Sequence, residues 1–427
     1  MTSQQIVSLL LALTVILAAS RLLGAAAEKL GQPAVIGEIL GGILAGPTVL
    51  HGAVGHALFP AGIGTALGAL ASVGVAMFMF VVGMEVSIGR SSRQGTAVGV
   101  GLAATIVPFL AGAALALHLG AGLTGDRRTA FELFFGSALA VTAFPVLARI
   151  LFDQRLMRTQ LGTWAMGSAA ICDVLSWSLL AVATAYARTG GTSPWTVLLV
   201  VPFAMVVVFV VKPLLRRLLP RISRGEVMLA VALIGTLLCG AVTERLGLHF
   251  IFGAFLFGLV MPRDDGTATV RVEVLDRVGQ LAVVLLLPIY FFTAGMKVDL
   301  SGLTGESVFD LALIIAVAIA AKTVPAYVAA RLSRVDPRRS VALAVLMNTR
   351  GLTELIILTV GLDLGILSPS LYSLMVVMAL VTTALTGPLL RLIRPERRAT
   401  ADEPATSRAA SGDPAGDVAR PDPVRGG

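Results

Sequence analysis

Residues 342–358 read ALAVLMNTRGLTELIIL, and the segment NTRG at residues 348–351 interrupts a run that is otherwise mostly apolar. A second run, GSALAVTAFPVLARIL at residues 136–151, contains Pro145. Proline removes a backbone donor and clashes with the carbonyl four residues before it, so it bends or ends a helix. We predict that both runs are broken membrane helices whose half-helix ends meet. A simple kink at Pro145 is the alternative for the second run.

Composition indicates a polytopic membrane protein. Of the 427 residues, 56% are hydrophobic and only 14% are charged, whereas a soluble domain carries about 25% charged residues. Apolar stretches close to the roughly 20 residues that cross a bilayer recur along the chain. We predict thirteen spans, at residues 4–26, 34–50, 66–88, 95–118, 130–151, 160–186, 194–218, 226–244, 247–261, 275–296, 307–331, 338–361 and 370–393.

The two ends of the chain differ in character. The first apolar run has no basic segment before it, and we expect a retained span and not a signal peptide. Residues 395–427 contain no aromatic residue, Leu, Ile or Met, so we predict a disordered tail. The two cysteines, Cys172 and Cys239, both fall in apolar spans and suggest neither a disulfide framework nor a metal site.

Basic residues predict the orientation, because cytoplasmic loops of membrane proteins carry an excess of Lys and Arg. With the N-terminus outside, the cytoplasmic side holds 23 basic residues and the other side holds five. The +8 net charge is therefore a topological signal and not evidence of nucleic-acid binding. We predict a multi-pass protein of the cell membrane with a cytoplasmic tail.

The chain also repeats itself at a shift of seven spans. The pairs are VIGEILGGIL (35–44) with IFGAFLFGLV (251–260), FMFVVGMEVSI (78–88) with YFFTAGMKVDL (290–300), and SALAVTAFP (137–145) with VALAVLMNT (341–349). A shift by an odd number of spans inverts the second unit in the membrane, which is typical of secondary transporters. The predicted fold class is all-α, with inverted repeats and two broken helices.

Asp173, in SAAICDVLSW at residues 168–177, is the candidate ion-binding residue. It lies fifteen residues from the nearest charge on either side, close to the bilayer centre, where an ionised carboxylate costs at least ~2.5 kcal/mol. A carboxylate takes one proton or one monovalent cation, and the two compete. The alternative is a protonated aspartate that hydrogen-bonds to a neighbouring helix.

Four further residues are candidates for a role at the predicted ion site, and each has a structural alternative. Lys322 is either a charge partner of Asp173 or the counter-charge of a half-helix C-terminus. Arg350 and Glu354 either take part in coupling or pair along one helix face. Cys172 either lines the site as a neutral group or packs as a small hydrophobe.

The motifs VIGEILGGILAGPTVL, FMFVVGMEV, TAFPVLARIL, CDVLSW and MNTRGLTELIILTVGLDLG resemble the cation:proton antiporter-2 family, Kef-like in its membrane part. The resemblance runs in order from about residue 30 to 393. It implies a homodimer in which a core domain (spans 4–6 and 11–13) moves against a dimer domain (spans 1–3 and 8–10), with span 7 as the linker. The membrane domain would cover residues 1–394.

By motif position, Asp173 matches the family's ion-binding aspartate and Lys322 its basic residue in span 11. Thr142 and Pro145 match the first broken helix. The stretch from Asn348 through Gly351 to Glu354 matches the second, with Asn348 and Thr142 as implied ion ligands.

Two features depart from the family pattern. Cys172 stands where related antiporters usually carry Asp, Asn or Gln, which bears on stoichiometry and ion choice. Kef-type systems also carry a C-terminal nucleotide-binding domain, whereas only a short tail follows the last predicted span here. We therefore expect no control through such a domain.

These features predict a transporter and not an enzyme. It would exchange Na⁺ or K⁺ for H⁺ by alternating access and contribute to pH homeostasis. Exchange would be electroneutral because Cys172 adds no titrating acid beside Asp173. The partners are the cation, the proton, the bilayer and a second copy, with no cofactor and no metal beyond the transported ion. The alternatives are a sodium-coupled organic-solute symporter on the same fold and a passive channel. An intramembrane aspartyl protease is excluded, since no GxGD motif occurs.

Overall fold

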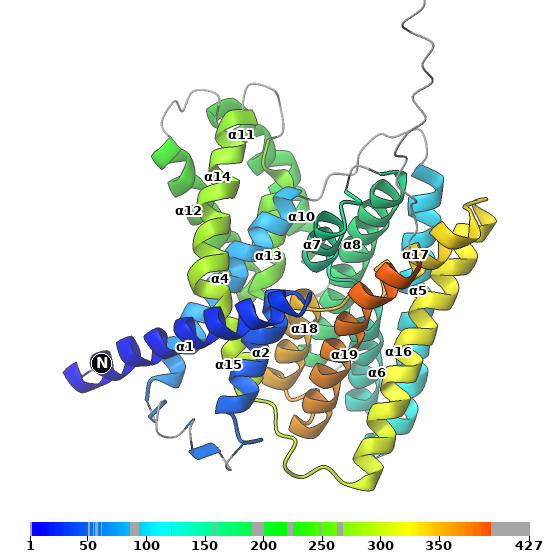
Figure 1. The fold of residues 1–427 in the computed structure, drawn as a ribbon. Coiled ribbons are helices and arrows are strands. Elements are labelled where there is room, and N and C mark those ends of the chain that lie inside the picture. The colour runs from blue at the N-terminus through cyan, green and yellow to red at the C-terminus, as the bar shows by residue number, and fades with distance from the viewer. Residues whose placement is uncertain are drawn as a thin grey trace, which may run out of the picture.

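The protein is described from a computed structural model in which every regular element is a helix (Figure 1). The described residues are 2–49, 52–53, 55, 59–60, 62–85, 94–120, 122–157, 159–189, 200–219, 225–246, 249–262 and 268–393. The predicted tail at residues 395–427 lies outside them.

Seven helices pack against one another in what we call the first bundle. They are α1 (Ser3–Lys29), α2 (Ala34–Ala45), α4 (Gly64–Glu85), α12 (Gly225–Arg245), α13 (Phe250–Val260), α14 (Ala268–Leu281) and α15 (Leu287–Met296). A π-helical turn, η5 (Ala282–Leu286), joins the last two.

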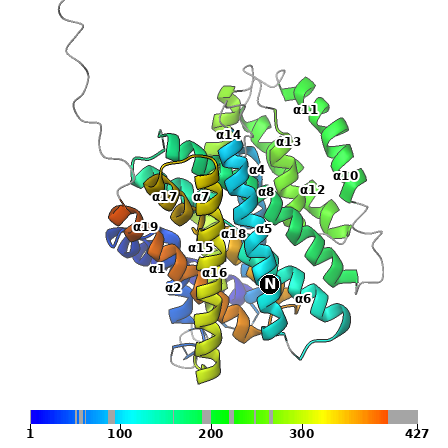
Figure 2. The same cartoon turned by 90° about the vertical axis from the view of Figure 1, so that its right-hand side faces the viewer.

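The second bundle contains eight helices; it lies beside the first in Figure 1, and α5 and α16 of this bundle face the viewer in Figure 2. They are α5 (Gln94–Leu119), α6 (Gly125–Ala140), α7 (Phe144–Asp153), α8 (Gln160–Thr189), α16 (Gly305–Leu332), α17 (Pro337–Met347), α18 (Leu352–Asp363) and α19 (Pro369–Ile393). The segment α10 (Val200–Val206), η2 (Val207–Val211) and α11 (Lys212–Leu218) follows α8 in the chain and packs on α13 through η2.

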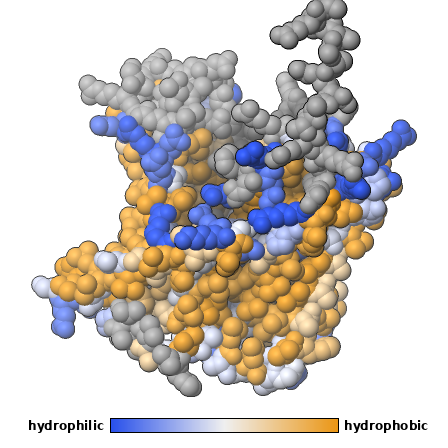
Figure 3. All heavy atoms as spheres, in the orientation of Figure 1, coloured by the Kyte–Doolittle hydropathy of each residue, from blue (hydrophilic) through white to orange (hydrophobic). Residues whose placement is uncertain are grey.

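Eight helices of the described part are long and apolar enough to cross a membrane. Large apolar side chains are exposed on their outer faces, including Leu11 of α1, Leu110 of α5 and Leu238 of α12. Figure 3 shows hydrophobic residues over most of the lower part of one face and hydrophilic residues gathered above them. Lipid contact explains this exposed apolar surface, since a soluble monomer seldom exposes contiguous apolar patches of this kind.

Helices α2 and α13 are apolar but have only 12 and 11 residues, too few to cross about 30 Å of hydrocarbon alone. Each packs by a glycine onto the helix before it in the chain. A Cβ on Gly37 would overlap the Leu23 carbonyl of α1, and a Cβ on Gly253 would overlap the Cys239 carbonyl of α12.

The same two helices also use equivalent glycines on a second neighbour. A Cβ on Gly42 of α2 would overlap the Phe292 carbonyl of α15, and one on Gly258 of α13 would overlap the Phe80 carbonyl of α4. Small residues that let backbones approach this closely are typical of helix packing in membranes.

Two further glycines make the reciprocal contacts, one from α4 to α13 and one from α15 to α2. Gly83 of α4 lies against the Phe255 carbonyl of α13, and Gly295 of α15 lies against the Ile39 carbonyl of α2. Residues that correspond in the repeated motifs therefore make the same close contacts in two parts of the first bundle: α2 with α1 and α15, and α13 with α12 and α4.

Substitution of Gly258 by alanine should destabilise the protein by about 1–3 kcal/mol, because the added methyl group meets backbone that cannot move away. Gly279→Ala in α14 is the matched control, since a Cβ there meets nothing within 4 Å and alanine favours the helix. The measurement is the midpoint of thermal loss of the monodisperse protein in detergent. Equal midpoints for the two variants would contradict this packing.

Candidate functional site

Two helices of the second bundle are interrupted, and the interruptions contact each other. Helix α6 ends at Ala140 and α7 begins at Phe144, while α17 ends at Met347 and α18 begins at Leu352. The backbone N–H of Ala143 donates to the Thr349 carbonyl at 2.9 Å. The Thr142 hydroxyl donates to the Met347 carbonyl, the last of α17, at 3.1 Å. Each interruption thus satisfies backbone groups of the other.

Pro145 is the second residue of α7, a position where the missing N–H costs no helix hydrogen bond. Gly351 has φ 151°, which disfavours residues with a side chain. A Cβ there would also lie 2.9 Å from Cγ2 of Val146 on α7. The second interruption therefore requires glycine for its backbone angle and for its contact with α7.

Thr383 of α19 hydrogen-bonds to the backbone of the second interruption, a role that was not predicted from the sequence. Its hydroxyl donates to the Arg350 carbonyl at 2.7 Å and accepts from the Arg350 N–H at 3.2 Å. The sequence signal was the pair of threonines at 382 and 383 in an apolar span. Such pairs are usually bonded within their own helix, as Thr382 is to Met378.

The C-terminal end of α6 is covered by two buried cations. Arg350 donates through Nη1 to the Ala138 carbonyl at 3.4 Å and through Nη2 to the Leu139 carbonyl at 3.1 Å. Lys322 of α16 donates to the Ala140 carbonyl. These carbonyls have no partner inside the helix, and the helix dipole is negative at this end. Lys322 therefore lies at the C-terminus of a half-helix, where its charge can counter the helix dipole, as in the structural alternative for this residue.

Arg350 and Glu354 form an ion pair at 2.7 Å, and both side chains are fully buried. The pairing expected from their spacing of four is present. Arg350 lies before the first residue of α18, so the same guanidinium links the start of α18 to the end of α6. Arginine suits this position because its planar group carries several donors in fixed directions.

Asp173 is fully buried on α8, which packs against α6, α7 and α17 beside the interruptions. Neither of its carboxylate oxygens accepts a hydrogen bond from any part of the chain that the structure describes. Lys322 donates to the Ala140 carbonyl and not to Asp173. A buried carboxylate without a partner requires a proton or a cation.

The remaining candidates differ in how they are engaged. The Cys172 thiol lies 3.4 Å from the Gly101 carbonyl of α5 and is fully buried, so it packs between α8 and α5. Asn348 is 6% exposed, and its side-chain oxygen has no hydrogen-bond partner among the described residues. That oxygen is available to an ion.

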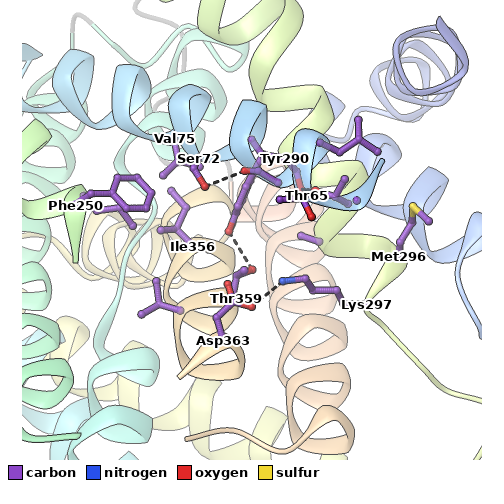
Figure 4. A pocket seen from close by; sticks show the side chains of 18 of the residues that line it. Thr65, Ser72, Val75, Phe250, Tyr290, Met296, Lys297, Ile356, Thr359 and Asp363 are labelled. Atoms are coloured by element: carbon purple, nitrogen blue, oxygen red, sulfur yellow. Dashed lines mark hydrogen bonds and ion pairs between the residues drawn. The ribbon is translucent and has the colours of Figure 1, made fainter. Parts of the chain in front are cut away.

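A cavity of about 650 Å³ lies between α4, α15 and α18 and contains none of the predicted site residues. Figure 4 shows side chains of α15 and α18 meeting across it. The Tyr290 hydroxyl lies 3.1 Å from that of Thr359, and Lys297 pairs with Asp363 at 2.9 Å. Tyr290 and Lys297 belong to the first bundle, and Thr359 and Asp363 belong to the second.

The buried pair Arg350–Glu354 predicts a large stability effect. Arg350→Leu or Glu354→Leu alone leaves a buried charge without its partner and should cost about 3–5 kcal/mol. The double variant should lose less than the sum. Arg128 and Glu132 are the matched control, because they have the same spacing at 2.8 Å but exposed side chains, a type worth at most about 1 kcal/mol. The measurement is the thermal midpoint in detergent, and additive losses at the buried pair would contradict the coupling.

Comparison with known proteins gives the family. The family described as "Sodium/hydrogen exchanger, transmembrane" matches residues 12–393. The Cation/H(+) antiporter 20 of Arabidopsis thaliana is 37% identical over 410 residues, which cover 90% of this chain and 48% of that protein. The chain thus spans about half the length of that relative. The Na(+)/H(+) antiporter NhaS4 of Synechocystis is 35% identical over 411 residues, which cover 92% of this chain and 99% of that protein.

The fold also matches a solved structure. The sodium proton antiporter MjNhaP1 from Methanocaldococcus jannaschii aligns with a TM-score of 0.71 at 15% identity, covering 92% of this chain and 98% of that one. The all-helical membrane fold expected from the motifs is therefore confirmed. The family match, the relatives and the fold agree, and the chain belongs to the sodium/hydrogen exchanger family.

Proposed function

We propose that this chain is a secondary active antiporter that exchanges a monovalent cation, Na⁺ or K⁺, for protons by alternating access. The observation that carries the proposal is Asp173, a fully buried carboxylate that has no hydrogen-bond partner among the described residues and lies on a helix packed beside the two interruptions. A proton or one cation neutralises it for the crossing, and the two occupants exclude each other.

The neighbouring charges support this assignment because each has another partner. Arg350 is neutralised by Glu354, and Lys322 lies on the Ala140 carbonyl. Asp173 is then the acid of this group that is left to exchange its occupant. Cys172 is engaged with Gly101 as a thiol donor, which supports a neutral role and electroneutral exchange of one cation for one proton.

The packing of the first bundle supports inverted repeats and thirteen membrane passages. Glycines 37, 42 and 83 and their carbonyl partners correspond to glycines 253, 258 and 295 and theirs in the alignment of the repeated motifs. Thirteen passages follow if α6 with α7, α17 with α18, α14 with α15, and α10 with α11 each count as one.

We assign the second bundle as the moving core domain and the first as the dimer domain, with α10 to α11 as the linker. Alternating access then requires the contacts of α15 with α18 to open and close. The cavity in Figure 4 would be the route to the outer side.

A sodium-coupled organic-solute symporter remains the second candidate from sequence. It would show solute uptake that needs sodium and no counterflow of protons. The titratable and otherwise unpaired Asp173 favours proton exchange.

Asp173→Asn should abolish exchange and leave the protein folded, because an amide cannot trade a proton for a cation. The assay is dequenching of a pH-sensitive dye in everted vesicles after addition of Na⁺, K⁺ or Li⁺. Asp310→Asn, in α16 at the rim of the fold where it faces His118, is the control and should exchange normally. Wild-type exchange by Asp173→Asn would refute the assignment.

Electroneutral exchange predicts that membrane potential alone drives no transport. Proteoliposomes with equal Na⁺ and equal pH on both sides receive a potential from a gradient of a lipophilic cation. The internal pH should follow that of Asp173→Asn liposomes, which report the leak. Faster proton movement with the wild-type protein would show net charge transfer and would make Lys322 the candidate for a second proton.

The orientation predicts that a tag placed after Arg398 lies in the cytoplasm. Protease added to intact cells should leave this tag uncut, whereas protease added to everted vesicles should remove it. The reverse pattern would show that the predicted orientation is wrong.

A further inference from the structure

Buried hydroxyl groups in this protein usually donate to a backbone carbonyl. On eight helix positions of the described residues the acceptor lies one turn earlier: Thr105, Ser137, Thr184, Thr236, Thr243, Ser373, Thr382 and Thr386. Among the described residues, Ser20, Ser176 and Thr353 are buried hydroxyls that have no partner. Such a group is costly to bury unless something else binds it.

Ser176 lies three residues after Asp173 on α8 and is 1% exposed. Residues three apart share one face of a helix, so Ser176 and Asp173 are neighbours about 4.5 Å apart along the axis. The other hydroxyls on this helix show that a backbone bond is available. Ser168 donates to the Ala97 carbonyl at 3.1 Å, and Ser178 to the Val174 carbonyl at 2.7 Å.

The turn that carries Ser176 also faces the boundary of the two bundles. Trp177 contacts Phe252 of α13 edge to face, with ring centroids 6.2 Å apart. Within the described part of the chain, three buried oxygens without partners therefore occur within one turn of α8 at this boundary: both carboxylate oxygens of Asp173 and Oγ of Ser176.

We propose that Oγ of Ser176 is a direct ligand of the cation carried by Asp173, an inference that rests on the proposed function. A cation that leaves water must regain oxygen ligands in place of its hydration shell. The hydroxyl oxygen supplies one through a lone pair, and it does not take up the transported proton. Ser176 therefore strengthens binding of the cation and not of the proton.

Because the hydroxyl strengthens binding of the cation and not of the proton, its removal should weaken cation binding alone. Ser176→Ala should raise the KM for Na⁺ by about threefold to tenfold, the equivalent of one lost hydrogen-bond-like contact. Because proton and cation compete for Asp173, the pH of half-maximal exchange at fixed Na⁺ should rise by about 0.5 to 1. The rate at saturating Na⁺ should stay within about twofold of wild type, since proton binding is unchanged.

The experiment measures exchange in proteoliposomes against NaCl and KCl titrations at several pH values. The variants are Ser176→Ala and Ser176→Thr, and Ser178→Ala is the matched control two residues further along the same helix. Threonine keeps the hydroxyl and should restore the KM and the pH profile. Sodium-dependent thermal stabilisation of the purified variants gives the cation affinity without transport.

An unchanged KM and pH profile in Ser176→Ala would overturn the proposal, as would a lowered maximal rate with unchanged KM in both variants. If Ser176→Ala does not fold, the isosteric pair Ser176→Thr and Ser176→Val decides: a lower Na⁺ affinity in the valine variant than in the threonine variant supports the ligand, and equal affinities refute it. Failure of the antiport function itself would appear separately, as absence of cation-dependent proton movement in the wild-type protein.

Discussion

Backbone polar groups that a broken helix exposes inside a bilayer have no water to bind, and this constraint governs the second bundle. The interruptions at residues 141–143 and 348–351 bind each other through Ala143 and Thr142. Thr383 binds the second interruption from α19. The last three carbonyls of α6 receive the side chains of Arg350 and Lys322. The broken segments persist because they complete hydrogen bonds of each other and receive further ones from α16 and α19.

The same constraint determines which buried charges of the second bundle are already engaged. Two cations are needed at the end of α6, and Glu354 neutralises Arg350 from within one turn of α18. Lys322 is directed to a carbonyl and lies too far from Asp173 for a hydrogen bond. Buried ion pairs add little net stability against apolar packing, but here the pair supplies donors that apolar residues lack. Asp173 remains without a partner because its neighbours are already engaged.

Local sequence patterns predicted what depends on neighbours along the chain. The long apolar helices and the interruptions near Pro145 and Gly351 follow from apolar length and breakers, and the spacing of four offered the pairing of Arg350 with Glu354 as one of two alternatives. The contacts of Lys322 with Ala140 and of Thr383 with Arg350 join residues 182 and 33 positions apart. No pattern within one helix specifies such partners. The unpaired state of Ser176 likewise depends on what three-dimensional packing leaves empty.

Helix α15 packs differently on its two sides. Gly295 of α15 lies against the Ile39 carbonyl of α2 with no space for a methyl group, so α15 cannot slide within the first bundle. On its other side α15 meets α18 through Tyr290 with Thr359 and through Lys297 with Asp363. The charged side chains there are 39% and 59% exposed, and such a pair is worth at most about 1 kcal/mol. The exposed pair between α15 and α18 is a weaker tie than the close backbone contact of α15 with α2, so the rocking movement that we propose for the second bundle would begin at this contact.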